Sequence, residues 1–265
     1  MSKLMLDTPD SGIATFEEVI RPVVPMRNTD TYKPISNLVL LNMLKNVADM
    51  QGLQLVNPEF GLARKGQRMF GVYEVEGHDH MGGEVRMMVG IRNAFDGTLS
   101  AGICFGSKVF VCSNLAFTGY AGEENDVTGK VTHKHTRNIE DTLFQRLKDG
   151  LCQINMFKDY QQKFYDSLRN IHMDENQAYA TIVRAVQSDA MPNKDIIKVA
   201  RLWDDSGNLD CEGQDNWHKE FYARNAWSLF NIFTENHKQY TERNPFDANQ
   251  RSIRLSQMFS NTFMN

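Results

Sequence analysis

The spacing of apolar residues predicts a first helix after a proline-rich start. Four prolines, at positions 9, 22, 25 and 34, interrupt residues 1–35. Proline fixes φ and lacks a backbone donor, so this segment is expected to be an extended N-terminal arm with at most a short helical turn. Apolar residues then recur at helical spacing over residues 36–52, where Ser36 or Asn37 can cap the helix and Gly52 can end it.

The pattern changes to that of β-strands over residues 54–114. Short runs of β-favouring residues are separated by turn signals at residues 65–66, at residues 95–97 (FDG) and at residues 105–108 (FGSK). Strands joined by such short turns are antiparallel neighbours. The stretch therefore predicts a meander of four or five strands, without the crossover helices that a parallel sheet requires.

The rest of the chain has the pattern of helices. Asn138 can cap a long helix over residues 139–168, and shorter helices are expected over residues 174–187 and 193–205. A long aromatic helix is expected over residues 215–240. The predicted fold is α+β, arranged as the arm (1–35), a helix with an antiparallel sheet and a long helix (36–172), and a helical region packed on the same domain (173–265).

Composition and charge limit the classes of function. The 265 residues are 41% hydrophobic and 23% charged, with a formal net charge of −4. This charge argues against a uniformly basic coat, yet it is compatible with a local basic surface. No apolar run approaches the roughly 20 residues of a membrane-spanning helix, and the first residues lack a signal peptide's apolar segment. We therefore expect a cytoplasmic protein without a membrane partner.

Two His-x-His pairs raise the question of a metal site. His78 and His80 form one pair, and His133 and His135 form the other. On a strand, both rings of a pair point to the same face, and two pairs could supply four nitrogens to a divalent ion such as zinc. The alternative is a solvated hairpin loop and a helix entry. No cofactor is predicted, and a divalent metal stays an open alternative.

A nucleophilic site would require a thiolate beside a base. Cys112 and His135 could meet if a strand end approached the following helix entry, with Asn114 beside them. However, Cys112 lies in the apolar stretch VFVCSN, which favours a small buried side chain, and Asn114 suits a strand-ending turn. These three residues are the catalytic candidates, although the sequence favours a binding protein over an enzyme.

Basic residues accompany the predicted hairpins and the helix entry THKHTRN. Arginine, lysine and a helix N-terminus all favour phosphate. The candidate phosphate-contacting residues are Arg64, Lys65, Arg68, Arg92, Lys108, Lys134 and Arg137. Aromatic side chains such as Phe70, Phe95 and Phe105 could stack on bases, although a core role is the simpler interpretation. Acidic neighbours such as Glu74 and Asp96 dilute the positive charge, so a solvated mixed-charge surface is the alternative.

Three segments in a fixed order resemble a known family. They are residues 91–117, which contain FDGT and KVFVCSN, the sequence HTRNI at 135–139, and NAWSLFNIFTENH at 225–237. In this order they resemble phage- and plasmid-like proteins catalogued as a domain of unknown function, over residues 36–240. The matching positions are Asp96, Gly97, Thr98, Lys108, Val109, Cys112, Asn114, His135, Thr136, Trp227, Asn231, Thr234, Glu235, and His237 or Asn236. The resemblance implies a phage or mobile-element origin and a cytoplasmic setting, and it implies no particular reaction.

Several functions remain open. The first is a phage-encoded nucleic-acid-binding protein that binds or anneals single-stranded DNA in recombination or replication, with a homo-oligomer as a further expectation. Phage single-strand annealing proteins share the order of helix, antiparallel meander and long helix, which is an analogy of fold. The alternatives are a non-enzymatic protein that binds a host defence factor, and a metal-dependent enzyme that uses Cys112, His133 and His135. ATPase and Rossmann enzymes are disfavoured because neither phosphate-binding glycine motif occurs.

Overall fold

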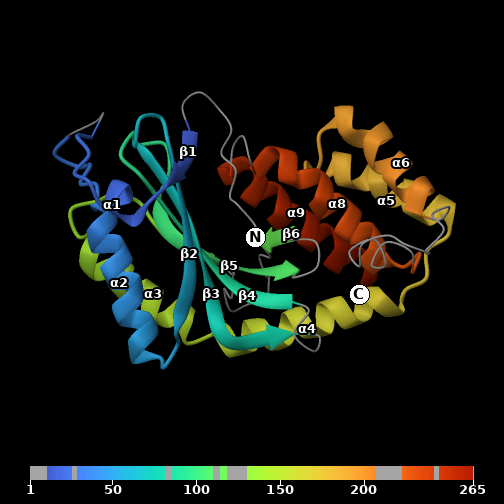
Figure 1. Ribbon diagram of the computed structural model, residues 1–265, viewed down its shortest axis with the longest axis horizontal. Helices are drawn as coiled ribbons and strands as arrows, with labels where there is room; N and C mark the ends of the chain where they lie inside the picture. Colours follow the sequence, from blue (N-terminus) through green and yellow to red (C-terminus); the bar gives the residue numbers. More distant parts are fainter. Residues whose placement is uncertain are drawn as a thin grey trace.

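The fold is α+β, as the sequence predicts. The computed structural model describes residues 11–25, 29–80, 85–109, 114–117, 130–206, 223–241 and 245–264. An antiparallel sheet lies in the N-terminal half, and the C-terminal half is helical (Figure 1). No helix in these ranges is long and apolar enough to cross a membrane.

The sheet is a meander with a split outer edge. Among the residues that the structure describes, the sheet has seven strands, and six of them follow one another as antiparallel neighbours. They are β1 (Ser11–Ala14), β2 (Leu55–Ala63), β3 (Arg68–His80), β4 (Val85–Ala94), β5 (Ala101–Val109) and β6 (Asn114–Phe117). The seventh, β7 (Lys130–His133), pairs with the first half of β5, whereas β6 pairs with the second half.

The sheet is larger than predicted. The expectation of four or five strands was wrong because β1, which lies in the residues expected to form the arm, pairs with β2, and because β7 adds a strand after the meander. The prediction of a turn at residues 105–108 was also wrong, because β5 continues through these residues with Gly106 in register opposite Met88. The turns between β2 and β3 and between β4 and β5 are confirmed.

The first predicted helix is confirmed as α2 (Asn37–Met50). The N–H of Val39 donates to the Ser36 hydroxyl at 3.2 Å, so Ser36 caps the helix. Gly52 has a φ of 68°, the left-handed conformation in which helices commonly end. The apolar face of α2, including Leu40 and Leu44, packs on one face of the sheet.

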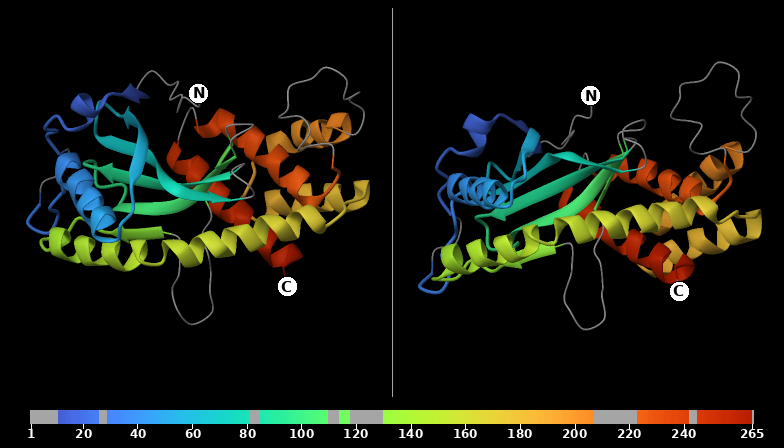
Figure 2. Two further views of the ribbon diagram at one scale, coloured as in Figure 1. Left: turned by 60° about the horizontal axis from the view of Figure 1, so that its bottom comes forward. Right: turned by 90° about the horizontal axis from the view of Figure 1, so that it is seen from below.

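The single helix expected over residues 139–168 is in fact two, α3 (Ile139–Leu151) and α4 (Ile154–Asn170). Between them, the Gln153 N–H bonds to the Gly150 carbonyl, three residues earlier, at 3.1 Å, which tightens the chain and ends the α-helical repeat. Helix α3 begins after Asn138 as predicted, but the Asn138 side chain makes no capping hydrogen bond. Figure 2 shows α4 running from beneath the sheet into the helical half.

The helical half has its own core. Its helices are α5 (Glu175–Gln187), α6 (Ile196–Ser206), α8 (Ala226–Thr241) and α9 (Pro245–Phe263), with the 3-10 turn η2 (Asn193–Asp195) before α6; the short α1 (Phe16–Val19) belongs to the sheet half. Trp203, Trp227, Phe230 and Phe259 are buried together here. Helix α9 also reaches the sheet, where its Ile253 packs against Phe70 and Met88, on the face opposite α2.

Candidate nucleic-acid interface

The strand register brings most of the predicted cations to one end of the sheet. Ala63, the last residue of β2, pairs with Arg68, the first of β3, and Arg68 also pairs with Ala94, the last of β4. At the same end β5 begins and β7 finishes, because Ala101 pairs with His133. The cations near this end, which we call the basic end, are Arg64, Lys65, Arg68, Arg92, Lys134 and Arg137. It lies away from α5 and α6 (Figure 1).

Lys108 is the exception among the seven predicted cations. Its backbone is in register with Arg86, toward the other end of β4 and β5. The side chain of Lys108 lies outside the described part of the structure. Lys108 therefore does not belong to the basic end.

The buried carboxylate of Asp96 joins the two turns of the basic end. One oxygen, Oδ2, accepts hydrogen bonds from Arg68 Nε at 2.7 Å and from Arg64 Nη1 at 3.5 Å. The other, Oδ1, accepts from the hydroxyl of Thr98 and from its N–H at 3.0 Å. Burial opposes the charge, but the hydrogen bonds from Thr98 and Arg68 together outweigh it and hold the pKa of Asp96 below its ordinary value.

Other cations of the basic end face solvent. Lys65, Lys134 and Arg137 are exposed, and they make no ion pair within the described ranges. Glu74, one of the acids expected to dilute the surface, is engaged farther along β3, where its carboxylate accepts from Arg86 Nη1 at 2.7 Å. The exposed Glu140 and Asp141 follow in the first turn of α3, so the basic surface ends there.

Arg92 is buried, unlike the other cations of the basic end. It is 8% exposed and stands opposite Phe70 on β3 and Gly102 on β5. Its Nη2 donates to Ser100 Oγ at 3.3 Å. Burial lowers the pKa of the Arg92 guanidinium, and the neighbouring Cys104 works in the opposite direction.

His135, a candidate for both catalysis and metal binding, holds the segment before α2 against this end. Its Nδ1 accepts a hydrogen bond from the Ile35 N–H at 3.4 Å, and its ring meets that of Tyr32 edge-on at 5.3 Å. Asn93 Nδ2 donates to the Ile35 carbonyl at 2.9 Å, so both the N–H and the carbonyl of Ile35 are hydrogen-bonded to side chains. Burial lowers the pKa of His135 to about 4, so its imidazole is neutral at physiological pH.

The two His-x-His pairs lie at opposite ends of the sheet and cannot share one ion. His78 is half-buried near the far end of β3, with Nε2 3.2 Å from Asn155 Oδ1, whereas His133 ends β7 at the basic end. The side chain of His80 lies outside the described residues. Within the residues that the structure describes, no three His, Cys, Asp or Glu side chains come together as a metal site.

The catalytic candidates are not brought together in the described part of the chain. Asn114 begins β6, where it pairs with Val109 at the far end of β5, while His135 follows β7 at the basic end. Cys112 and the Asn114 side chain lie outside the described residues. The described geometry therefore gives His135 a positioning role and shows no base beside a nucleophile.

Two residues of α8 that match the family pattern, Asn236 and His237, belong to a polar network inside the helical half. Asp195 Oδ2 accepts from Asn236 Nδ2 at 2.9 Å and from the Tyr240 hydroxyl at 2.7 Å. His237 Nε2 lies 2.9 Å from the Ala190 carbonyl oxygen, and burial lowers the pKa of His237 to about 4. These contacts attach α8 to the segment before α6, so this stretch of the motif is structural.

Sequence reasoning missed the contribution of α9. Gln250 and Ile253 of this helix lie against Arg92, although the sequence of the tail carried no clear pattern. Such a contact joins residues about 160 positions apart, and a single sequence holds no signal for it. The basic residues themselves could be found because they flank recognisable turns.

The fold and the ordered motifs together define a class. It is an α+β protein in which the sheet half and the helical half both carry residues of the three family-like segments, 91–117, 135–139 and 225–237. The chain belongs to the family described as a domain of unknown function (DUF932), which matches residues 27–258. This match confirms the predicted resemblance to a domain of unknown function, and it extends from the segment before α2 into α9. No curated protein and no solved structure matches the chain.

Proposed function

We propose that the protein binds single-stranded nucleic acid at the basic end of the sheet. The observation that most supports this proposal is the convergence of Arg64, Lys65, Arg68, Lys134 and Arg137, which come from different turns and loops. Phosphate groups are the ligands that clustered arginine and lysine side chains favour. The expectation of a cytoplasmic phage or mobile-element protein acting in recombination or replication belongs to this proposal.

The cations would contribute in two ways. Asp96 holds Arg64 and Arg68, so these guanidinium groups are oriented before a ligand arrives and lose less freedom on binding. Lys65, Lys134 and Arg137 are exposed, and neutralisation of phosphates by such side chains releases counterions. Binding of this kind depends on the backbone and is independent of base sequence.

A single strand suits this surface better than a duplex. The cations of the basic end come from the β2–β3 turn, from the start of β3 and from the loop after β7, and not from one continuous element. A flexible strand can adapt its path to such separate contacts, whereas duplex DNA, with a persistence length of about 150 base pairs, resists bending. The aromatic residues that could have stacked on bases, Phe70, Phe95 and Phe105, are buried and fill the core. We therefore expect weak base preference.

The proposal is tested by fluorescence anisotropy with a labelled single-stranded oligonucleotide, with the duplex as a comparison. The triple variant K65Q/K134Q/R137Q removes three exposed cations of the basic end and should lose at least about tenfold in affinity. The matched control is K163Q/K198Q/R201Q, which removes three exposed cations of the helical half and should bind like the wild type. Equal affinities of the two triple variants, or no binding at low salt, would refute the proposal.

A further inference from the structure

Arg92 is a buried cation that has no carboxylate partner among the residues that the structure describes. Two other arginines of β3 and β4 differ in this respect: Arg68 is paired with Asp96 at 2.7 Å, and Arg86 is paired with Glu74 at 2.7 Å. In the ranges that the structure describes, the contact of the Arg92 guanidinium is the neutral hydroxyl of Ser100. A guanidinium has five N–H donors, and within the described residues Arg92 donates only to Ser100, so its other N–H groups are available to water or to a ligand.

The absence of a carboxylate partner has a physical consequence. A charge removed from water is costly unless an opposite charge or several hydrogen bonds replace the lost hydration. Burial lowers the pKa of Arg92, which is the expected direction for an uncompensated cation. The cost of this charge falls if an anion enters from solvent.

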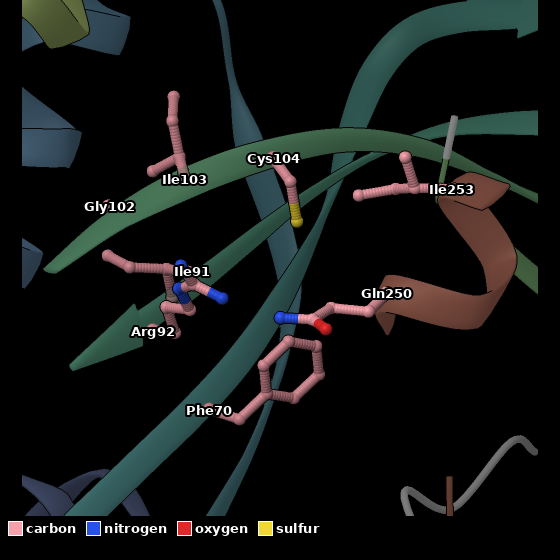
Figure 3. A pocket seen from close by; sticks show the side chains of 8 residues that line it. All are labelled: Phe70, Ile91, Arg92, Gly102, Ile103, Cys104, Gln250 and Ile253. Carbon is pink, nitrogen blue, oxygen red and sulfur yellow. The ribbon is translucent and has the colours of Figure 1, made fainter. Parts of the chain in front are cut away.

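The guanidinium faces a small cavity between the sheet and α9. The cavity, of about 10 Å³, is lined by Phe70, Cys104, Gln250 and Ile253 beside Arg92. Figure 3 shows the amide end of Gln250 reaching from α9 toward Arg92, above the ring of Phe70. Gln250 is exposed and makes no hydrogen bond within the described ranges, so its amide is available as a second donor at the mouth.

We propose that Arg92 and Gln250 form an anion subsite that takes one oxygen of a phosphate group. The cavity has room for one water-sized atom, so a single phosphate oxygen enters and the rest of the group stays at the mouth. The unpartnered N–H groups of Arg92 and the Gln250 amide donate to that oxygen. Nothing in the cavity reads a base, which fits a phosphate ligand.

The subsite belongs to the basic end, of which Arg92 is the buried cation. Arg92 is in register with Phe70, two residues along β3 from Arg68, so both arginines belong to the same face of the sheet. On the proposed function, the phosphate is one phosphodiester of the bound strand. The same chemistry would also hold inorganic phosphate, and the experiment separates these two sources.

The first measurement is thermal unfolding in increasing inorganic phosphate, with ionic strength held constant by a bulky organic anion. The wild type is expected to show a saturable rise in Tm. R92M should show no such rise, and its Tm without phosphate should equal or exceed that of the wild type, because the uncompensated charge is gone. R201M makes the same substitution at an exposed arginine of α6 and should respond like the wild type.

A second variant, Q250A, keeps the test informative if R92M does not fold. Gln250 is exposed, so Q250A should fold normally, and it should need a severalfold higher phosphate concentration for half of the Tm rise. The same phosphate response in R92M, Q250A and the wild type would overturn the subsite. So would the absence of any saturable response in the wild type.

A titration with single-stranded oligonucleotide then separates the subsite from the proposed function. If the strand binds, R92M should weaken it and reduce the salt slope by about 0.7. If phosphate raises the Tm through Arg92 but the oligonucleotide does not bind, the subsite stands for free phosphate and the proposed function falls. Normal oligonucleotide binding by R92M, together with loss of the phosphate response, would overturn the assignment of the subsite to the strand.

Discussion

Arg68 Nε lies 2.7 Å from Asp96 Oδ2, and this ion pair joins the turn after β2 to the turn after β4. The Phe95 N–H, next to Asp96, also donates to the Gln67 carbonyl at 2.7 Å, so the two turns form one unit. This unit carries three of the predicted phosphate contacts, Arg64, Lys65 and Arg68. Its rigidity therefore bears on both stability and the proposed binding.

Removal of the Asp96 carboxylate should destabilise the fold. D96A loses the acceptor of Arg68, Arg64 and Thr98 at a side chain that is 3% exposed, and it should lower the free energy of unfolding by about 2–4 kcal/mol. D96N keeps a neutral acceptor for Thr98 and should lose about half as much. Urea denaturation measures both. D205A, at an exposed aspartate of α6, is the control, and an equal effect of D96A and D205A would contradict this role.

Asn93 should be equally sensitive to substitution. Its Nδ2 donates to the Ile35 carbonyl at 2.9 Å and to Asn37 Oδ1 at 2.8 Å, and the side chain is buried. N93L, of similar size, would leave both acceptors buried without a donor, at a cost of about 2–4 kcal/mol. Amide hydrogen exchange of Ile35 should accelerate in N93L more than exchange in α5 does. Unchanged exchange at Ile35 would mean that Asn93 does not secure this segment.

The buried histidines should make stability fall in mild acid. Burial lowers the pKa of His135 and of His237 to about 4 from an ordinary value of 6.5. Above the ordinary value neither state is protonated. Between the two values the unfolded chain binds protons and the folded chain does not, so stability decreases as pH falls through this window and the decrease levels off below about pH 4. We expect a loss of about 1–3 kcal/mol for each histidine.

The variant H135N isolates one of these two contributions. Asparagine keeps a short acceptor for the Ile35 N–H and does not titrate. Urea denaturation between about pH 7 and pH 4.5 should therefore show a shallower decline for H135N, with the part due to His237 retained. A pH profile of H135N that matches the wild type would show that His135 does not titrate across this window on unfolding.

The sequence predicted the features that depend on local signals. Ser36 as a cap, Gly52 after α2 and the glycine turns around Gly66 and Gly97 are visible within a few residues, and all are confirmed. The β2–β3 and β4–β5 turns must lie at the same end of an antiparallel meander, which is why the predicted cations converge.

Features that depend on distant contacts were not predictable. Strand β1 pairs with β2 across a separation of about 50 residues, and its four residues carry no strand pattern of their own. The burial of Arg92 depends on α9. From the sequence alone, this buried arginine could not be distinguished from an exposed arginine on the same strand. Gly106 resembles a turn residue, yet pairing with β4 on one side and β6 on the other keeps β5 extended through it.

The salt dependence of single-strand affinity tests the central claim most directly. If Arg64, Lys65, Arg68, Lys134 and Arg137 each contact a phosphate, the logarithm of the affinity should fall linearly with the logarithm of salt concentration, and these five cations should contribute about −3.5 to the slope, to which a phosphate at Arg92 would add about −0.7. In K65Q/K134Q/R137Q the slope should shrink by about 2.1, while K163Q/K198Q/R201Q keeps the wild-type slope. An affinity independent of salt, or the same slope in both triple variants, would contradict binding at the basic end.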